Sequence, residues 1–159
     1  MTSLRRVAFA IGAGLALVRP AAAQSGHFPW RAGDKPPKLV GFWLGQRLDS
    51  ARKALKGPVT IDTLGRAPTM VFSYSTVDNS LSVLGTSAGG VAIITVRRRD
   101  LAALDRVRVG DRCGDVLKRW GKPSRSDAVV AMWIAGKWAV SARCDARGIV
   151  SELSVGNLA

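Results

Sequence analysis

The chain has 159 residues, with 24 Lys and Arg against 11 Asp and Glu, and its formal net charge is +13. Apolar residues make up 47% and charged residues 22%, which is typical of globular proteins and excludes a wholly disordered chain. The presence of only one short apolar run excludes a polytopic membrane protein, and one His with two Cys excludes most multi-ligand metal sites.

Residues 1–23 have the pattern of a secretory signal peptide. Arg5 and Arg6 precede an apolar stretch at 7–18, and the alanines that end at Ala23 supply a small-residue cleavage pattern. The stretch is about 12 residues long, shorter than the roughly 20 that span a bilayer, which disfavours a retained anchor. Ordinary secretion is favoured over twin-arginine export, because the residues after the paired arginines fit the latter poorly. We therefore expect a periplasmic or secreted protein, cleaved near Ala23.

Residues 24–38 follow as a segment punctuated by Pro and Gly, and they contain His27, the single His of the chain. Pro forbids helix and interrupts strands, so the segment is predicted to be a flexible N-terminal arm. On this interpretation His27 is a solvated side chain or an incidental metal contact.

A pattern then recurs with a spacing of 65 residues. Gly45 and Gly110 each open a short helical pattern, and Pro58 and Pro123 follow its end. Apolar residues fall on one face of each predicted helix: Leu48, Ala51 and Leu55 in the first, and Cys113, Val116, Leu117 and Trp120 in the second.

Strand-like segments separated by turn residues follow each predicted helix. They span 69–76, 80–86 and 90–97 after the first helix, and 127–134, 137–144 and 149–155 after the second. The predicted fold class is therefore α+β, with two tandem repeats at 39–100 and 101–159. Each repeat is expected to be a short helix packed on a three- to four-stranded antiparallel meander.

The two cysteines are predicted to form a disulfide. Cys113 opens the apolar stripe of the second helix, and Cys144 ends the core face of a strand in the same repeat. Both side chains are expected to point into one helix–sheet interface, and export favours an oxidised pair. The alternative is two buried free thiols.

These two segments resemble a known repeat. Leu44-Gly45-Gln46-Arg47 with Gly57-Pro58, and Val109-Gly110-Asp111-Arg112 with Gly121-Lys122-Pro123, are similar to the repeat of the β-lactamase inhibitor proteins and of the small BamE (SmpA/OmlA) assembly lipoproteins. Tandem copies look more like the inhibitors, and the absence of a Cys after the signal peptide departs from the lipoproteins. The resemblance implies a protein-binding role, and no binding residue is carried over from it.

Sequence motifs for enzymes are missing. The chain has no Gly-x-Ser-x-Gly elbow, phosphate loop or His-rich metal motif. We therefore expect a non-enzymatic protein with no catalytic residue, no cofactor and no metal site. A pair of aspartates acting as acid and base, as in a small hydrolase, is the less favoured alternative.

The candidate partner-binding residues are basic and aromatic. They are Trp43, Tyr74, Trp133, Arg97, Arg98 and Arg99. Arginines attract anionic partners and aromatic side chains concentrate interface energy, although solvated charges and core packing are the alternatives.

Taken together, these features predict an exported, inhibitor-like module that binds another protein of the bacterial cell envelope through an exposed sheet face. The alternative is an envelope assembly factor, or one associated with anionic lipid. Nucleic acid is not expected as a partner, because the chain carries no stacking-aromatic motif of the RNA-binding kind.

Overall fold

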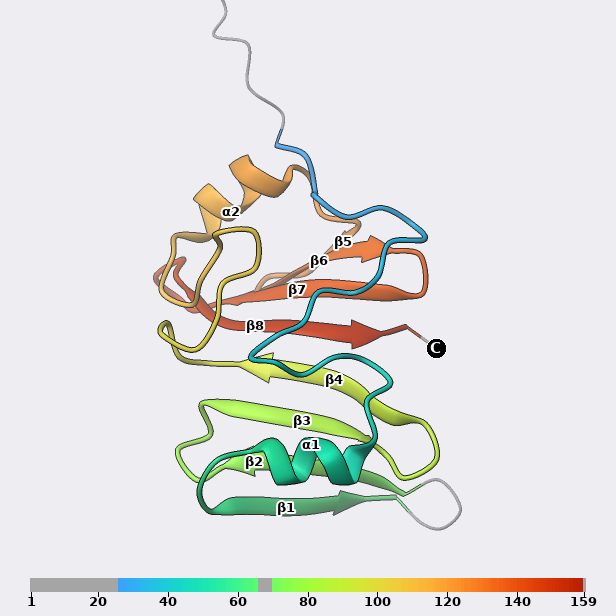
Figure 1. Ribbon diagram of the computed structural model, residues 1–159. Helices are drawn as coiled ribbons and strands as arrows, with labels where there is room; N and C mark the ends of the chain where they lie inside the picture. The colour runs from blue at the N-terminus through green and yellow to red at the C-terminus, as the bar shows by residue number, and fades with distance from the viewer. Residues whose placement is uncertain (1–25, 66–69, 159) are drawn as a thin grey trace, which may run out of the picture.

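A computed structural model describes residues 26–65 and 70–158, which form one antiparallel sheet with two short helices (Figure 1). The strands lie in the order β1-β2-β3-β4-β8-β7-β6-β5, so β1 and β5 are the edges while β4 and β8 meet at the centre. The elements in chain order are α1 (Leu48–Ala54), β1 (Val59–Leu64), β2 (Val71–Thr76), β3 (Leu81–Thr86), β4 (Gly90–Val96), α2 (Cys113–Trp120), β5 (Arg125–Ser126), β6 (Val130–Ala135), β7 (Trp138–Cys144) and β8 (Val150–Asn157).

The expected fold class, two tandem repeats that each place a helix on a separate meander, is wrong. All the strands belong to one continuous eight-stranded sheet. Strands β4 and β8 join the two halves in antiparallel register, from Ile93 opposite Gly156 to Val96 opposite Leu153. Two separate meanders would leave these two strand edges with unpaired backbone groups, and pairing them removes both exposed edges.

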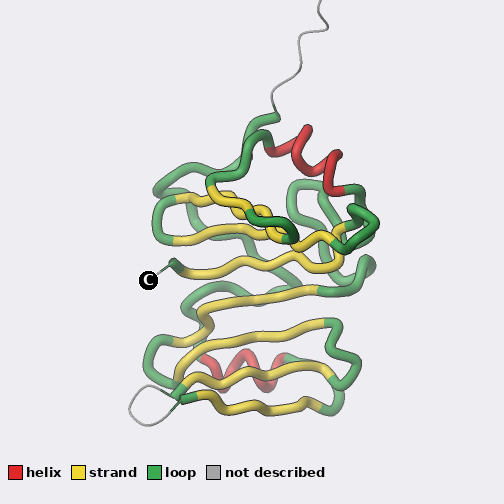
Figure 2. The backbone as a smooth tube through the Cα atoms, turned by 180° about the vertical axis from the view of Figure 1, so that it is seen from behind, coloured by secondary structure: helices red, strands yellow, loops and turns green. Residues whose placement is uncertain are grey.

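One face of the sheet carries the core. Side chains that lie opposite one another on successive strands are buried there: Tyr74, Val83, Ile94, Val155, Val140 and Trp133. Helix α1 lies over this side of the sheet in front of β2 and β3 (Figure 1), and we call it the helix-covered face. The strands turn the opposite side, the open face, toward the viewer in Figure 2, where α1 lies behind them.

The helices bury the stripes that their apolar spacing predicts, with one exception. Leu48 and Ala51 of α1 and the adjoining Leu55 are buried. In α2, Val116 and Trp120 are buried, whereas Leu117 is 43% exposed. A helix of only eight residues contacts the sheet along a narrow line, which leaves Leu117 at its rim.

The first described residues lie against the second half of the sheet. Phe28 and Trp30 pack on the core, with ring centroids 6.0 Å from Trp120 and 6.1 Å from Trp138, respectively. The Trp138 indole N–H donates to the Asp34 carbonyl at 3.0 Å. The described part of the predicted arm is therefore attached to the sheet, while the predicted signal peptide at 1–23 lies outside the described residues.

The predicted disulfide between Cys113 and Cys144 is confirmed. The two Cα atoms lie 6.3 Å apart, within the usual range for a bridge. The bond ties the first residue of α2 to the last residue of β7, so it holds the helix on the sheet.

Candidate functional site

The open face carries a row of hydroxyl side chains that runs across six strands. The strand register places them directly opposite one another in the order Thr60, Ser75, Ser82, Thr95, Ser154 and Ser141. Neighbouring strands lie about 4.8 Å apart, so the row is regular. At the central joint Thr95 Oγ1 and Ser154 Oγ are 3.0 Å apart, and this hydrogen bond satisfies two buried hydroxyls. We call this set the hydroxyl row.

An aliphatic row runs beside the hydroxyl row. Leu84 pairs with Ile93, Ile93 with Gly156, Gly156 with Ala139, and Ala139 with Ile134. Ile93 is 37% exposed although it lies on a central strand. Gly156 opposite Ile93 carries no side chain, so the row is shallow at the middle of the sheet. A flat aliphatic surface flanked by hydroxyls suits contact with another protein.

A third row on the open face is ionic. Glu152 Oε2 accepts from Arg97 Nε at 2.9 Å, while Glu152 Oε1 lies 4.0 Å from Arg143 Nε. Arg97 Nη1 also donates to the Asn79 side chain at 3.1 Å. One carboxylate therefore serves two guanidinium groups, and the Arg143 side chain, 52% exposed, leaves a net positive charge on this face.

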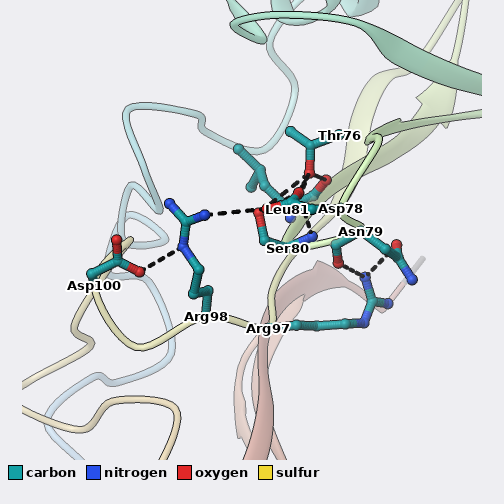
Figure 3. A network of polar contacts seen from close by, with 8 residues as sticks. All are labelled: Thr76, Asp78, Asn79, Ser80, Leu81, Arg97, Arg98 and Asp100. Carbon is teal, nitrogen blue, oxygen red and sulfur yellow. Dashed lines mark hydrogen bonds and ion pairs between the residues drawn. The ribbon is translucent and has the colours of Figure 1, made fainter.

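Arg98 belongs to a network at the β2–β3 hairpin (Figure 3). Its Nε donates to Asp100 at 2.7 Å and its Nη1 to Asp78 Oδ2 at 3.2 Å. Asp78 Oδ1 also accepts from Thr76 Oγ1 at 2.7 Å and from Ser80 Oγ at 2.8 Å. Two carboxylates thus neutralise Arg98, and the network fixes the conformation of the hairpin.

The same hydrogen bonds make acid stability depend on Asp78. Donation from Thr76, followed by donation from Ser80, lowers the pKa of Asp78 from 3.8 to about 2. Because the folded-state pKa is below the unfolded one, ionised Asp78 stabilises the fold above about pH 4. That stabilisation is lost as the pH falls from about 4 toward 2.

We expect Asp78→Asn to flatten this part of the stability profile, measured by urea denaturation at steps between pH 2 and pH 5. Asp62→Asn, at an exposed β1 position, is the matched control and should leave the wild-type slope unchanged. Equal slopes in wild type and Asp78→Asn would contradict the prediction.

Arg99 lies apart from the two preceding arginines. Its Nη1 donates to Asp111 Oδ1 at 2.9 Å, which directs the side chain toward the start of α2. Arg97 and Arg98 therefore both contact the β2–β3 hairpin, through Asn79 and Asp78, whereas Arg99 pairs with Asp111 before α2. Strand β4 ends at Val96, and the bend and turn that follow at Arg98 and Arg99 change the direction of the backbone, so the side chains do not alternate as they would in a strand.

The three candidate aromatic residues are also separated. Tyr74 is 6% exposed on the helix-covered face, where its ring stacks on Phe72 at 6.4 Å. Trp133 is 2% exposed, and its indole N–H donates to the Gly121 carbonyl at 3.2 Å. Only Trp43, 44% exposed beside Lys38, is accessible to a partner.

The sequence indicates which side chains of a single strand lie on the open face, but it does not show how neighbouring strands align there. Alternation along β7 by itself puts Ser141 and Arg143 on the side opposite Trp138. The hydroxyl and aliphatic rows depend on cross-strand register, which alternation within single strands does not give. Leu84 and Ile93 were missed because an aliphatic residue in a strand is normally assigned to the core.

Across 26–65 and 70–158, no group of three or more His, Cys, Asp or Glu side chains is placed to hold a metal ion. His27 is exposed. In the same part of the chain, no helix has the length and apolar character needed to cross a bilayer.

Comparisons with known proteins identify a fold and no family. No protein-family model matches the chain, and no curated protein matches it in sequence. Among solved structures, the fold is similar to a cysteine-rich secretory protein (SAV1118) from Staphylococcus aureus subsp. aureus Mu50. The TM-score is 0.57 at 12% sequence identity, and the match covers 84% of this chain and 50% of that protein. The chain thus spans about half the length of its structural neighbour.

The resemblance to the β-lactamase inhibitor proteins and BamE-type lipoproteins is therefore corrected. It depended on two independent helix-and-meander repeats, whereas the structure has one undivided sheet, and a solved structure with a similar fold is described as a cysteine-rich secretory protein. The short Gly–helix–Gly/Pro motif describes how a helix begins and ends before a strand, which many folds need. The disulfide itself is typical of proteins in oxidising compartments, which indicates an exported protein.

Proposed function

We propose that this protein is an exported, non-enzymatic binding module of the bacterial cell envelope that docks on an acidic surface of another protein. The observation that carries the proposal is the open face, where exposed Ile93 lies in an aliphatic row beside the hydroxyl row. No described helix covers this face (Figure 2). Exposed apolar surface bordered by polar groups is characteristic of protein interfaces.

Charge supports an acidic partner. The whole chain carries +13, and 13 − 3 = +10 remains once Arg5, Arg6 and Arg19 leave with the expected signal peptide. The ionic row adds two arginines against one glutamate on the far side of the hydroxyl row from the aliphatic row. Arg125 on β5 extends the positive charge, because the register places it opposite Met132, which in turn lies opposite Ser141 of the hydroxyl row. Complementary charge would steer the approach of an acidic protein and set its orientation, whereas the aliphatic row would supply the buried contact.

The test introduces a negative charge into the aliphatic row, which an acidic partner surface would repel. We expect Ile93→Glu to weaken binding of the purified partner at least tenfold, because the carboxylate is buried against an acidic surface without a counter-ion. Ile61→Glu is the matched control. Ile61 is 45% exposed, but it lies on β1 opposite Tyr74 and therefore on the helix-covered side. The control should bind within about twofold of wild type.

The partner is obtained with a photo-crosslinking residue at position 93, and the same residue at position 61 reports background. Binding is then measured with both purified proteins by calorimetry at two salt concentrations, and a complementary-charge interface should weaken at the higher one. Ile93→Ser, which matches the neighbouring hydroxyls, replaces Ile93→Glu if the glutamate variant melts early. Equal losses for positions 93 and 61, or no loss at either, would exclude the open face as the docking surface.

A further inference from the structure

A second surface, formed by the segment after β4 and by α2, gathers positive charge in a cavity. The cavity has a volume of about 700 Å³ and lies between the loop that leads into α2 and α2 itself. Its lining includes five cationic side chains: Arg99, Arg106, Arg112, Lys118 and Arg119. None of them belongs to the three rows of the open face. We call this cavity the basic cleft.

The acids that line the basic cleft neutralise only part of this charge. Asp111 pairs with Arg99 at 2.9 Å, and Asp115 pairs with Lys118 at 3.5 Å. Within residues 26–65 and 70–158, Arg106, Arg112 and Arg119 take part in no ion pair. Three guanidinium groups around one cavity therefore lack an anion from the described chain.

The turn that carries Arg106 is strained. Leu104 and Val107 exchange backbone hydrogen bonds of 2.9 and 2.8 Å, and the two residues between them, Asp105 and Arg106, have φ of 45° and 68°. Two consecutive positive φ values define a hairpin turn that Asn and Gly normally occupy. Asp105 has a structural reason to be there, because its carboxylate accepts the Trp120 indole N–H at 3.1 Å.

The chain itself shows that Arg106 is unnecessary for this turn. A turn of the same form lies 65 residues earlier, where Leu39 and Phe42 exchange backbone hydrogen bonds of 2.9 and 3.0 Å. Its two central residues are Val40 and Gly41, with φ of 55° and 83°. The position of Arg106 is therefore taken by glycine in the earlier turn, as the left-handed conformation favours. A strained arginine is best explained by what its side chain does in the basic cleft.

We propose that the basic cleft binds a phosphate-bearing ligand through Arg106, Arg112 and Arg119. The planar guanidinium fork donates two parallel hydrogen bonds to phosphate oxygens, and three such groups match a multiply charged phosphate better than a single carboxylate. The shared chemistry is the phosphate group, which a soluble compound or a lipid headgroup can supply. This site is independent of the proposed docking on the open face, and either can fail alone.

The test uses the full disulfide-bonded protein and inorganic pyrophosphate as the probe, with binding measured by calorimetry at low ionic strength. We expect saturable binding that Arg106→Gly weakens at least tenfold. Because glycine relieves the strained φ, the same variant should melt at or above the wild-type temperature, which separates lost binding from lost folding. Arg112→Gln should also weaken binding.

The control is Arg47→Gln, since Arg47 is exposed and precedes α1 as Arg112 precedes α2, 65 residues later. It removes the same charge and should leave pyrophosphate affinity within twofold. If Arg47→Gln and Arg106→Gly lost the same amount of pyrophosphate affinity, the effect would come from the overall charge of the protein, and the proposal would be overturned. Unchanged pyrophosphate affinity in Arg106→Gly would also overturn it.

Vesicles distinguish the source of the phosphate. If a lipid headgroup occupies the basic cleft, the protein should sediment with phosphatidylglycerol–phosphatidylcholine vesicles. Pyrophosphate should then displace the protein from the vesicles, and Arg106→Gly should abolish vesicle binding. Pyrophosphate binding without vesicle binding supports the same site with a soluble ligand. Vesicle binding that persists in Arg106→Gly, without pyrophosphate binding by the wild type, overturns the proposal.

Discussion

Reduction of the Cys113–Cys144 disulfide is expected to lower the free energy of unfolding by about 3.5 kcal/mol. The bond closes a loop with a sequence separation of 31, and in the chain-entropy model a loop of this length restricts the unfolded chain by about that amount. A domain of this size has a net stability of only about 5–15 kcal/mol, so the loss is a large fraction of the whole. Urea denaturation with and without reductant measures it.

The chain offers a clean control for this experiment, because it contains two cysteines and both are in the bond. A Cys113→Ala/Cys144→Ala variant should match the reduced wild type to within about 1 kcal/mol, and reductant should change its stability no further. A reduced protein as stable as the oxidised one would show that the bond fixes α2 without stabilising the fold.

Trp120→Ala is expected to destabilise the protein by about 4 kcal/mol, within the range for large aromatic side chains removed from a core. Trp120 is 1% exposed, and its ring lies 5.1 Å from Trp133 and 6.0 Å from Phe28, between centroids. Its removal takes away the contact through which α2 and the first described residues share one core. Proteolysis near Phe28 should therefore accelerate alongside the loss of stability.

Trp43→Ala provides the comparison, since it deletes the same side chain where it is 44% exposed. The Lys38 Nζ atom lies 5.0 Å from the centroid of the Trp43 ring, and an exposed cation–π contact of this kind contributes about 1 kcal/mol or less. Equilibrium denaturation of the two variants in parallel gives the difference. A loss below about 1.5 kcal/mol for Trp120→Ala would mean that the aromatic cluster is not the centre of this core.

Local features of the fold were predictable because they depend on neighbouring residues. The apolar spacing predicted the two helices, which the structure has at Leu48–Ala54 and Cys113–Trp120. Turn residues separated strands such as the one predicted at 137–144 and observed at Trp138–Cys144. The cysteines were predicted to share one interface and do form the bond. Each of these depends on periodicity within one element or on two elements in the same half of the chain.

The two edge strands were missed for a physical reason. Strand β1, Val59–Leu64, is exposed along most of its length, and β5 has only two residues, Arg125–Ser126. An edge strand pairs on one side only and need not bury alternate side chains, so its sequence shows no clear two-residue periodicity. Pairing with β2 and β6, respectively, is what makes them strands.

The joint between the halves and the open face were not predictable from single strands. Nothing in β4 or β8 alone specifies that Ile94 lies opposite Val155, yet this pairing creates one sheet from two halves. Aromatic side chains were expected to mark the docking surface, but Tyr74 and Trp133 fill the core instead. Large rings gain more free energy under a helix than on an open sheet, so aliphatic and hydroxyl side chains remain for the surface.

The central position of β8 has a consequence for how the molecule reaches its final form. The last strand in chain order inserts between β4 and β7, and its register with each extends to residues near 156. A nascent polypeptide that lacks this strand has two incomplete halves with their inner edges bare, and it can close only when the final strand emerges. Until that strand is in place, β4 and β7 each present an unpaired edge that is open to pairing with another chain.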